Sequence, residues 1–274
     1  MNSINTNIGA MIALQNLNAI NRDLQTTQNR ISTGLKVASA KDDGATWAIA
    51  QSQRSTVSSL DAVKESLSRN SSVVDVAMTA GESVSDLLTQ LKEKALAASD
   101  TSLDSVARSA LKNDFVAIRN QITKTLATAG FNGINLLNGS KTSIAALANA
   151  EGTSRLTVAA QNMSLGGSIV TLGASADFST ATSAAALLST LDSSINNVSA
   201  ALARLGTSSK ALDNHLTFIS KLQDTITAGI GNLVDADLAK ESARLQSLQV
   251  RQQLAIQMLS FSAKSQSWVL SLFR

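Results

Sequence analysis

The sequence predicts a mainly α-helical protein: an elongated bundle of long heptad-patterned helices, with paired terminal coiled-coil helices and a small central β-hairpin region. Three observations favour this fold class. Apolar residues recur at three- and four-residue steps over long stretches, the 274-residue chain contains no proline, and only its centre is rich in Gly, Ser and Thr. Average usage would give on the order of a dozen prolines. Since proline breaks helix interiors, its absence fits long helices.

The N-terminal segment carries a sparse heptad repeat. Its apolar positions lie seven residues apart, at Ala10, Leu17, Leu24 and Ile31. Gln, Asn, Ser and Thr dilute this stripe, so a lone helix of this kind buries too little apolar area to offset a chain entropy of roughly 1–2 kcal/mol per residue. We expect the segment to be disordered in the free chain and to become ordered against partners.

The stretch RISTGLKVASAKDDGATWAIA, residues 30–50, predicts a joint between two helical segments. Its characteristic residues are two glycines and a short charged cluster: Gly34, Lys41, Asp42, Asp43 and Gly44. No histidine or cysteine lies nearby to support catalysis. Because adjacent carboxylates in a turn are usually solvated or ion-paired, we interpret this cluster as structural rather than as an acid–base pair.

Two long helices are predicted next. The first follows an apolar stripe that breaks only at Asn70 and Gly81. The members of this stripe are Leu60, Val63, Leu67, Val74, Ala77, Val84, Leu88, Leu91, Ala95 and Ala98. The second helix, from about residue 103 to residue 126, has one apolar face made of Leu111, Phe115, Ile118 and Ile122.

The centre of the chain, residues 130–182, predicts a small β-containing region. Gly, Ser, Thr and Ala dominate it, and FNG and LNG are turn signals. RLTVAAQ, residues 155–161, and GSIVTLG, residues 167–173, read as the two short strands of a hairpin.

The heptad pattern returns in a third long helix. Its apolar positions are Leu188, Leu191, Ile195, Val198, Leu202, Leu205, Leu212, Leu216, Ile219 and Ile226. Narrow seams of this kind cannot be buried by one helix alone, so the long helices should pack together as a bundle. His215 lies on this helix as the only histidine of the chain, and we expect it to be exposed or at a rim.

The C-terminal segment mirrors the N-terminal one. Its diluted apolar seam consists of Leu238, Leu245, Leu248, Ala255, Leu259 and Val269. Asp235 and Asp237 precede it, where acidic groups cap a helix or complement its dipole. We expect this segment, like the first, to order against partners, which indicates an assembling protein.

The composition argues against several functional classes. With no cysteine and one histidine, thiolate nucleophiles and the usual zinc sites are unsupported, and we expect no enzymatic activity, cofactor or metal. A net charge of +3 without a Lys/Arg run, and 3% aromatic residues, predict no nucleic-acid partner. No apolar stretch approaches the ~20 residues that span a bilayer, so no membrane partner is expected. Residues 1–9, MNSINTNIG, lack the features of a cleavable signal peptide.

Several motifs, in order and near both ends, resemble those of bacterial flagellin, the subunit of the flagellar filament. They are INTN (4–7), RISTGLKVASAKDD (30–43), AIA (48–50), FNGINLL (131–137), LVDADLAKESA (233–243) and VLSLFR (269–274). The resemblance covers roughly the first 140 and the last 90 residues. The centre of the chain is much shorter than in the large flagellins, so the resemblance is to the short type with a reduced central variable region.

The resemblance implies a division of the chain into six parts. These are an N-terminal inner-tube helix (1–33), a spoke (34–55), outer-tube helices (56–139), a small variable β/loop region (140–182), an outer-tube helix (183–232) and a C-terminal inner-tube helix (233–274). The ten residues of the two terminal seams would form the assembly seam of the inner tube, and the joint would be the spoke.

The resemblance also implies partners and a location. The chain would polymerise with itself into a helical homopolymer for swimming motility. It would be exported without a signal peptide by the flagellar type III apparatus, and would meet the filament cap, the hook–filament junction proteins and a cytoplasmic export chaperone. The expected location is the extracellular filament. Two alternatives stay open, a hook–filament junction protein and a soluble coiled-coil adaptor.

Overall fold

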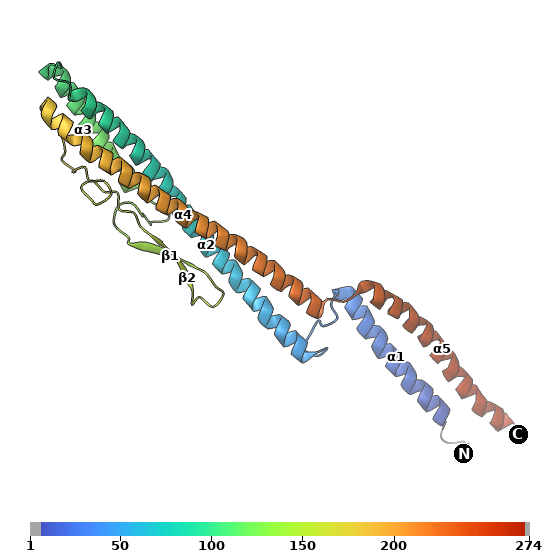
Figure 1. Cartoon of the computed structure of the whole chain (residues 1–274). Coiled ribbons are helices and arrows are strands. Elements are labelled where there is room, and N and C mark those ends of the chain that lie inside the picture. The colour runs from blue at the N-terminus through green and yellow to red at the C-terminus, as the bar shows by residue number, and fades with distance from the viewer. Residues whose placement is uncertain (1–6, 272–274) are drawn as a thin grey trace. The chain divides into compact units, whose positions relative to one another are not determined.

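A computed structural model describes the backbone of residues 7–271, and the side chains of residues 7–262 and 264. Within this part of the chain, five α-helices and two β-strands follow one another (Figure 1). They are α1 (Ile8–Thr33), α2 (Gly44–Ala98), α3 (Ser105–Thr128), β1 (Ser143–Leu147), β2 (Arg155–Ala159), α4 (Ala181–Val234) and α5 (Leu238–Ser271). The predicted fold class, mainly helical with a small central hairpin, is confirmed.

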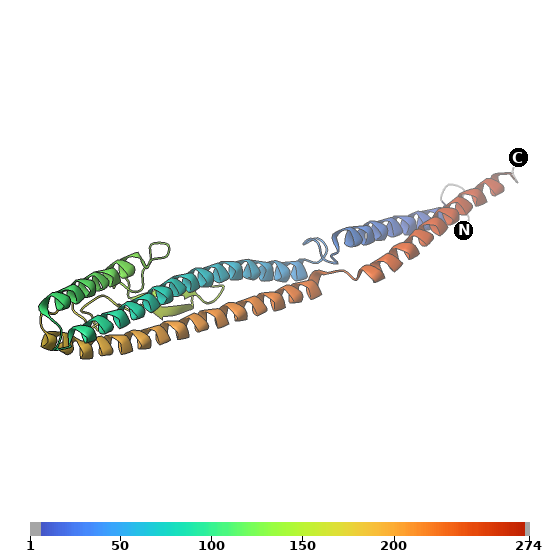
Figure 2. The same cartoon turned by 90° about the horizontal axis from the view of Figure 1, so that it is seen from above.

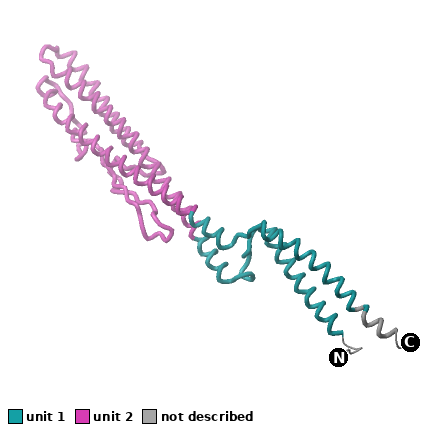
Figure 3. Tube along the Cα trace, turned by 45° about the vertical axis from the view of Figure 1, so that its right-hand side comes forward, with its two compact units in different colours: residues 1–55, 225–274 teal, residues 56–224 magenta. Residues whose placement is uncertain are grey.

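The chain divides into two compact units, coloured separately in Figure 3. Unit 1 comprises residues 1–55 and 225–274, and unit 2 comprises residues 56–224. Because α2 and α4 are long, each of these helices contributes residues to both units.

The core of unit 2 follows the apolar stripes read from the sequence. All ten predicted stripe residues between Leu60 and Ala98 are at most 2% exposed. On α4, the positions that repeat every seven residues from Leu191 to Ile219 are buried, whereas the intervening stripe residues are half-buried. The stripe breaks at Gly81 for a steric reason, because a Cβ there would lie 2.7 Å from Leu202 Cδ2. The two long helices therefore pack through the faces that their sequences indicate.

The third helix of unit 2 is held by specific contacts. Figures 1 and 2 both show α3 running beside α2. At the turn between them, the Arg108 guanidinium donates hydrogen bonds to the carbonyls of Ala98, Asp100 and Leu103, which caps the end of α2. The buried rings of Phe115 and Phe178 meet edge to face at 5.3 Å.

The hairpin differs from the predicted one in its partner strand. β2 lies where a strand was predicted, but it pairs antiparallel with β1, from Ser143 opposite Ala159 to Leu147 opposite Arg155. The prediction that residues 167–173 form the second strand is wrong. In that stretch the carbonyl of Leu172 accepts a hydrogen bond from the Gly166 amide, and the Thr171 amide donates to Ser194 Oγ on α4. The segment thus bonds locally and to a helix rather than to a strand.

The hairpin is fixed to the helices of unit 2 by two contacts. The Leu147 amide donates to Ser66 Oγ on α2 at 3.1 Å, and His215 Nε2 lies 2.8 Å from the carbonyl oxygen of Ala148. His215 is half-buried, so it is a rim residue as expected, and its ring contacts the ring of Phe218. The lone histidine therefore has a structural role in positioning the β1–β2 turn.

Truncation of a leucine to alanine should destabilise unit 2 strongly at a buried position of α2 and only slightly at an exposed one. We expect Leu88→Ala to lower the free energy of unfolding of unit 2 by about 3 kcal/mol, because a fully buried leucine loses its transfer energy and leaves a cavity. Leu96→Ala, two turns later on the same helix at a position that is 57% exposed, should cost less than about 0.5 kcal/mol. Urea unfolding followed by circular dichroism measures both, and equal losses would contradict the assignment of the stripe.

Candidate functional site

The described part of unit 1 is built around α1 and α5, which lie side by side in both Figure 1 and Figure 2. Three polar contacts show that they run antiparallel, because low numbers on α1 meet high numbers on α5. Asn7 Nδ2 donates to the Ser262 carbonyl at 2.9 Å, Gln252 Nε2 donates to Asn21 Oδ1 at 2.7 Å, and Arg30 Nη1 donates to Glu241 Oε1 at 3.0 Å.

Most of the predicted seam residues face this helix pair. Leu24 and Leu248 are buried, at 7% and 4% exposed. Six further seam residues are half-buried: Ala10, Leu17, Ile31, Leu245, Ala255 and Leu259. Leu238, the first residue of α5, is 49% exposed, and the side chain of Val269 lies outside the described residues. The structure thus brings eight seam residues into the α1–α5 pair, and their role in assembly stays a prediction.

Burial within the pair falls off toward the chain ends. The buried residues of the described parts of α1 and α5 are Leu24, Thr27, Glu241 and Leu248. All of them lie in the half of the pair where α1 ends and α5 begins. In the other half the seam residues are at best half-buried. A single copy of the pair therefore buries little of its terminal half.

A second set of apolar residues, most of them on the same terminal half, is exposed on α1 and α5. Its members are about half or more exposed: Ile8, Met11, Ile12, Leu14, Val250, Leu254, Ile256, Met258 and Phe261. We call this set the outer apolar face. The heptad pattern of the sequence did not identify these residues, because they lie off the stripe. The signal that could have found them is the presence of large apolar residues off the stripe, since exposed apolar residues in number indicate an interaction surface.

Two short segments connect the terminal helices to the two long helices, α2 and α4. We call residues 34–43, between α1 and α2, and residues 235–237, between α4 and α5, the connectors. They pair with each other: the Lys36 amide donates to the Val234 carbonyl at 2.7 Å, and the Ala236 amide donates to the Gly34 carbonyl at 2.8 Å. Gly34 ends α1 with φ of 70°, a left-handed conformation that glycine adopts without strain. Gly44 is simply the first residue of α2.

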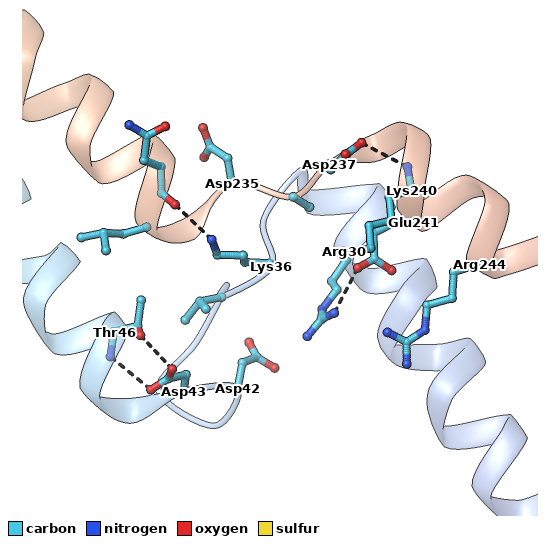
Figure 4. Close-up of a pocket in the computed structure, with 14 residues that line it drawn as sticks. Arg30, Lys36, Asp42, Asp43, Thr46, Asp235, Asp237, Lys240, Glu241 and Arg244 are labelled. Atoms are coloured by element: carbon cyan, nitrogen blue, oxygen red, sulfur yellow. Dashed lines mark hydrogen bonds and ion pairs between the residues drawn. The ribbon is translucent and has the colours of Figure 1, made fainter.

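The two adjacent aspartates shape the longer connector. Asp42 Oδ2 accepts hydrogen bonds from the amides of Ala38 and Ser39 and from Ser39 Oγ. Asp43 caps α2, because its carboxylate accepts from the amides of Ala45 and Thr46 and from Thr46 Oγ1 (Figure 4). Lys41 is exposed beside them. Both aspartates therefore hold the conformation of their own loop and of the first turn of α2.

These hydrogen bonds make the connector sensitive to acid. The Ser39 amide and hydroxyl lower the pKa of Asp42 below its ordinary value of 3.8, with smaller help from the Ala38 amide and the Arg30 charge. The Thr46 hydroxyl and amide lower the pKa of Asp43 in the same way, with smaller help from the Ala45 amide. A carboxyl whose folded pKa is depressed stabilises the fold above its unfolded pKa, and this contribution is lost as the pH falls through the folded pKa.

We expect the carboxyl carbons of Asp42 and Asp43 to titrate with midpoints below 3.8 wherever the connector is folded. Carbon-13 NMR of the labelled full chain measures these midpoints. Midpoints of Asp42 and Asp43 that coincide with the value in unfolded chain would show that the capping hydrogen bonds are absent.

A hollow of about 650 Å³ opens between the connectors and the adjoining ends of α1 and α5 (Figure 4). We call it the connector hollow. Its charged lining combines five carboxylates with four cations: Asp42, Asp43, Asp235, Asp237, Glu241, Arg30, Lys36, Lys240 and Arg244. Asp237 caps α5, since its Oδ1 accepts from the Lys240 amide at 3.1 Å. Lys36 Nζ donates to the Asn232 carbonyl at 3.0 Å.

The ion pair of Arg30 with Glu241 lies in the connector hollow and is only partly satisfied. The Glu241 side chain is 10% exposed and the Arg30 side chain 30% exposed. Glu241 Oε2 and Arg30 Nε are both buried, and neither has a hydrogen-bond partner among the described residues. Sequence reasoning did not identify this pair, because the two residues are 211 positions apart.

The described residues show no chemistry of other kinds. They contain no cluster of His, Cys, Asp and Glu side chains that could hold a metal ion. Among their helices, none combines the length and the apolarity that crossing a bilayer requires. The described part of unit 1 has two other surface features: the exposed apolar residues of α1 and α5, and the polar connector hollow where α1 ends and α5 begins.

Comparison with known proteins identifies the family. The model of the bacterial flagellin N-terminal helical region matches residues 4–142, and that of the C-terminal helical region matches residues 188–273. Flagellin FljM of Caulobacter vibrioides is 54% identical over 274 residues, which span 100% of this chain and 99% of the relative. A flagellin of Brucella melitensis is 36% identical, with 100% of both chains covered.

The solved structures agree at the level of the fold. The crystal structure of Bacillus cereus flagellin superposes with a TM-score of 0.51 at 21% identity, over 56% of this chain and 88% of that chain. The family models match at both ends of the sequence, and the relatives match along its whole length. The chain therefore belongs to the bacterial flagellin family.

Proposed function

We propose that this flagellin is a structural, non-enzymatic subunit that polymerises with copies of itself into the filament of a bacterial flagellum. The observation that carries this proposal is the outer apolar face. Two of its members, Met258 and Phe261, are 68% and 77% exposed, although both lie on a helix that already pairs with α1. Large exposed apolar residues are costly in water, and a polymer removes them from water without any further partner.

The burial pattern also suggests when the terminal helices become ordered. Half-buried seam residues and an exposed apolar face do not offset the conformational entropy that two long helices lose. The missing burial would come from neighbouring copies. A head-to-tail contact of this kind, repeated without closure, generates a helical filament. The terminal helices, residues 1–33 and 233–274, would then form the inner tube of that filament.

The remaining segments follow in this proposal. Residues 34–55 form the spoke, residues 56–139 and 183–232 the outer-tube helices, and residues 140–182 the variable region. The chain leaves the cell through the flagellar type III apparatus. An export chaperone, the filament cap and the hook–filament junction proteins are its other partners, and the extracellular filament is its destination.

Seeded polymerisation tests the proposal. Purified chain, made monomeric by heat or acid, should elongate seeds into long filaments that electron microscopy and sedimentation detect. Met258→Ser with Phe261→Ser should prevent elongation, because both changes lower the apolar area that a neighbour covers. Gln257→Ser, at the exposed polar position that precedes Met258, should leave elongation unchanged. Wild-type chain that binds seeds without elongating would instead be a junction protein, and one that stops at a small closed oligomer would be an adaptor.

A further inference from the structure

Glu241 is an unusual residue of unit 1, because its charged side chain is buried. Arg30 neutralises it through Oε1, but the second carboxylate oxygen, Oε2, is buried without a partner among the described residues. A buried carboxylate oxygen without a donor costs free energy comparable to a lost charge-assisted hydrogen bond. Native proteins rarely leave such an atom unsatisfied. The state in which this chain functions is therefore expected to supply a donor.

The cations that line the connector hollow do not supply it. Arg30 already donates to Oε1, and Lys36 Nζ is held by the Asn232 carbonyl. Lys240 and Arg244 line the hollow from α5, but no ion pair joins either of them to Glu241 in the structure. Figure 4 shows the Lys36 and Arg244 side chains apart from the Glu241 carboxylate.

The hollow suits an incoming lysine side chain. Its volume of about 650 Å³ leaves ample room, and Val37, Leu233 and Ala236 provide apolar lining for the aliphatic stem of a lysine. Asp235 and Asp237 add negative charge to the lining. A lysine ammonium, with three donors, could bond Glu241 Oε2 and still face these carboxylates.

We propose that the connector hollow of one subunit receives the Lys41 side chain of a neighbouring copy, whose ammonium donates to Glu241 Oε2. This inference rests on the proposed function, since it names a contact within the polymer. Lys41 is exposed and lies within a loop that three hydrogen bonds to Asp42 hold in one shape. In a helical polymer all copies are equivalent, so their connectors lie at the same distance from the axis and the connector of one copy can meet that of the next.

The contact also explains how one connector can serve two neighbours. Lys41 and the hollow are different parts of the same surface, so the contact is heterologous: each subunit gives a lysine to one neighbour and receives a lysine from another. Contacts of this type propagate instead of closing into a dimer. Lys41 would therefore help to fix which surfaces of the connectors meet, in addition to the apolar contacts of the terminal helices.

Cross-linking between subunits tests the geometry. Because the chain contains no cysteine, an introduced cysteine is its only thiol. Ala40→Cys places a thiol beside Lys41 and keeps the lysine, whereas Lys240→Cys places one at the hollow. A mixture of these two single-cysteine chains should give a cross-linked heterodimer with a short bis-maleimide in filaments but not in monomers. Lys124→Cys, on α3, mixed with Lys240→Cys should give none. Normal filaments without the first cross-link would overturn the proposal, whereas wild-type chain that never polymerises would overturn the proposed function instead.

A double-mutant cycle tests the chemistry. Lys41→Met should raise the critical concentration for polymerisation by about tenfold, equivalent to about 1.4 kcal/mol. In the Glu241→Gln background, where the carboxylate charge is gone, Lys41→Met should have little further effect. Equal effects of Lys41→Met in both backgrounds would overturn the proposal. So would a cycle in which Arg244→Met, rather than Lys41→Met, loses its effect when Glu241 is replaced.

Discussion

Leu248→Asp should abolish filament formation while leaving unit 2 folded. Leu248 is 4% exposed in the α1–α5 pair, so the substitution puts a charge without a partner into the best-packed part of that contact. Burial of such a charge costs several kcal/mol for each subunit. We expect this cost to exceed the favourable free energy of adding one subunit to a filament. The measurement is seeded polymerisation followed by sedimentation and electron microscopy.

Two controls make this result specific. Gln253→Asp introduces the same charge at an exposed position of α5 and should allow elongation. The circular dichroism and thermal unfolding of unit 2 should be unchanged in both variants, because residues 56–224 form a separate compact unit. If Leu248→Asp subunits elongate seeds as the wild type does, the assignment of this residue to the seam is wrong.

Arg30→Met should have an effect of similar size. It leaves the buried Glu241 carboxylate without its cation, and removal of one partner from a buried ion pair costs about 3–5 kcal/mol. We expect the critical concentration to rise beyond the range in which filaments form, and the exchanged pair, Arg30→Glu with Glu241→Arg, to restore part of the loss. The critical concentration measured by sedimentation reports both.

The matched control for this prediction is the exposed pair of Arg69 with Glu65 in unit 2. Their side chains are 60% and 75% exposed, so Arg69→Met should change stability by less than about 0.5 kcal/mol and leave the critical concentration unchanged. Equal effects of Arg30→Met and Arg69→Met would show that burial of the Arg30–Glu241 pair is unimportant.

The parts of the fold that could be predicted are those specified by local periodicity. The stripe from Leu60 to Ala98 repeats for many turns, so its phase is unambiguous, and every member is buried. Asp237 was recognised as a cap because capping depends on residues only three positions away. The hairpin partner was missed because strand pairing is not local. SIAAL, residues 143–147, contains two alanines and a serine and carries little β propensity, yet it is the strand that pairs.

The candidate site was predictable only in part, for the same reason. The seam residues follow a heptad, and eight of the nine with described side chains are buried or half-buried in the α1–α5 pair, whereas their role in assembly stays a prediction. The outer apolar face includes residues such as Met11 and Ile12 that break the heptad phase, and a search for one stripe discards them. The Arg30–Glu241 pair arises when the two ends of the chain meet, and no local pattern marks which arginine meets which glutamate.

The central claim is that the terminal helices gain their order by burying their apolar surface among copies of the chain. Amide hydrogen exchange of residues 8–33 and 238–262, compared between dilute monomer and assembled filament, tests this claim most directly. We predict exchange within seconds in the monomer and protection by several orders of magnitude in the filament, with residues 56–224 protected in both. Equal protection of the terminal helices in the dilute monomer would contradict the claim.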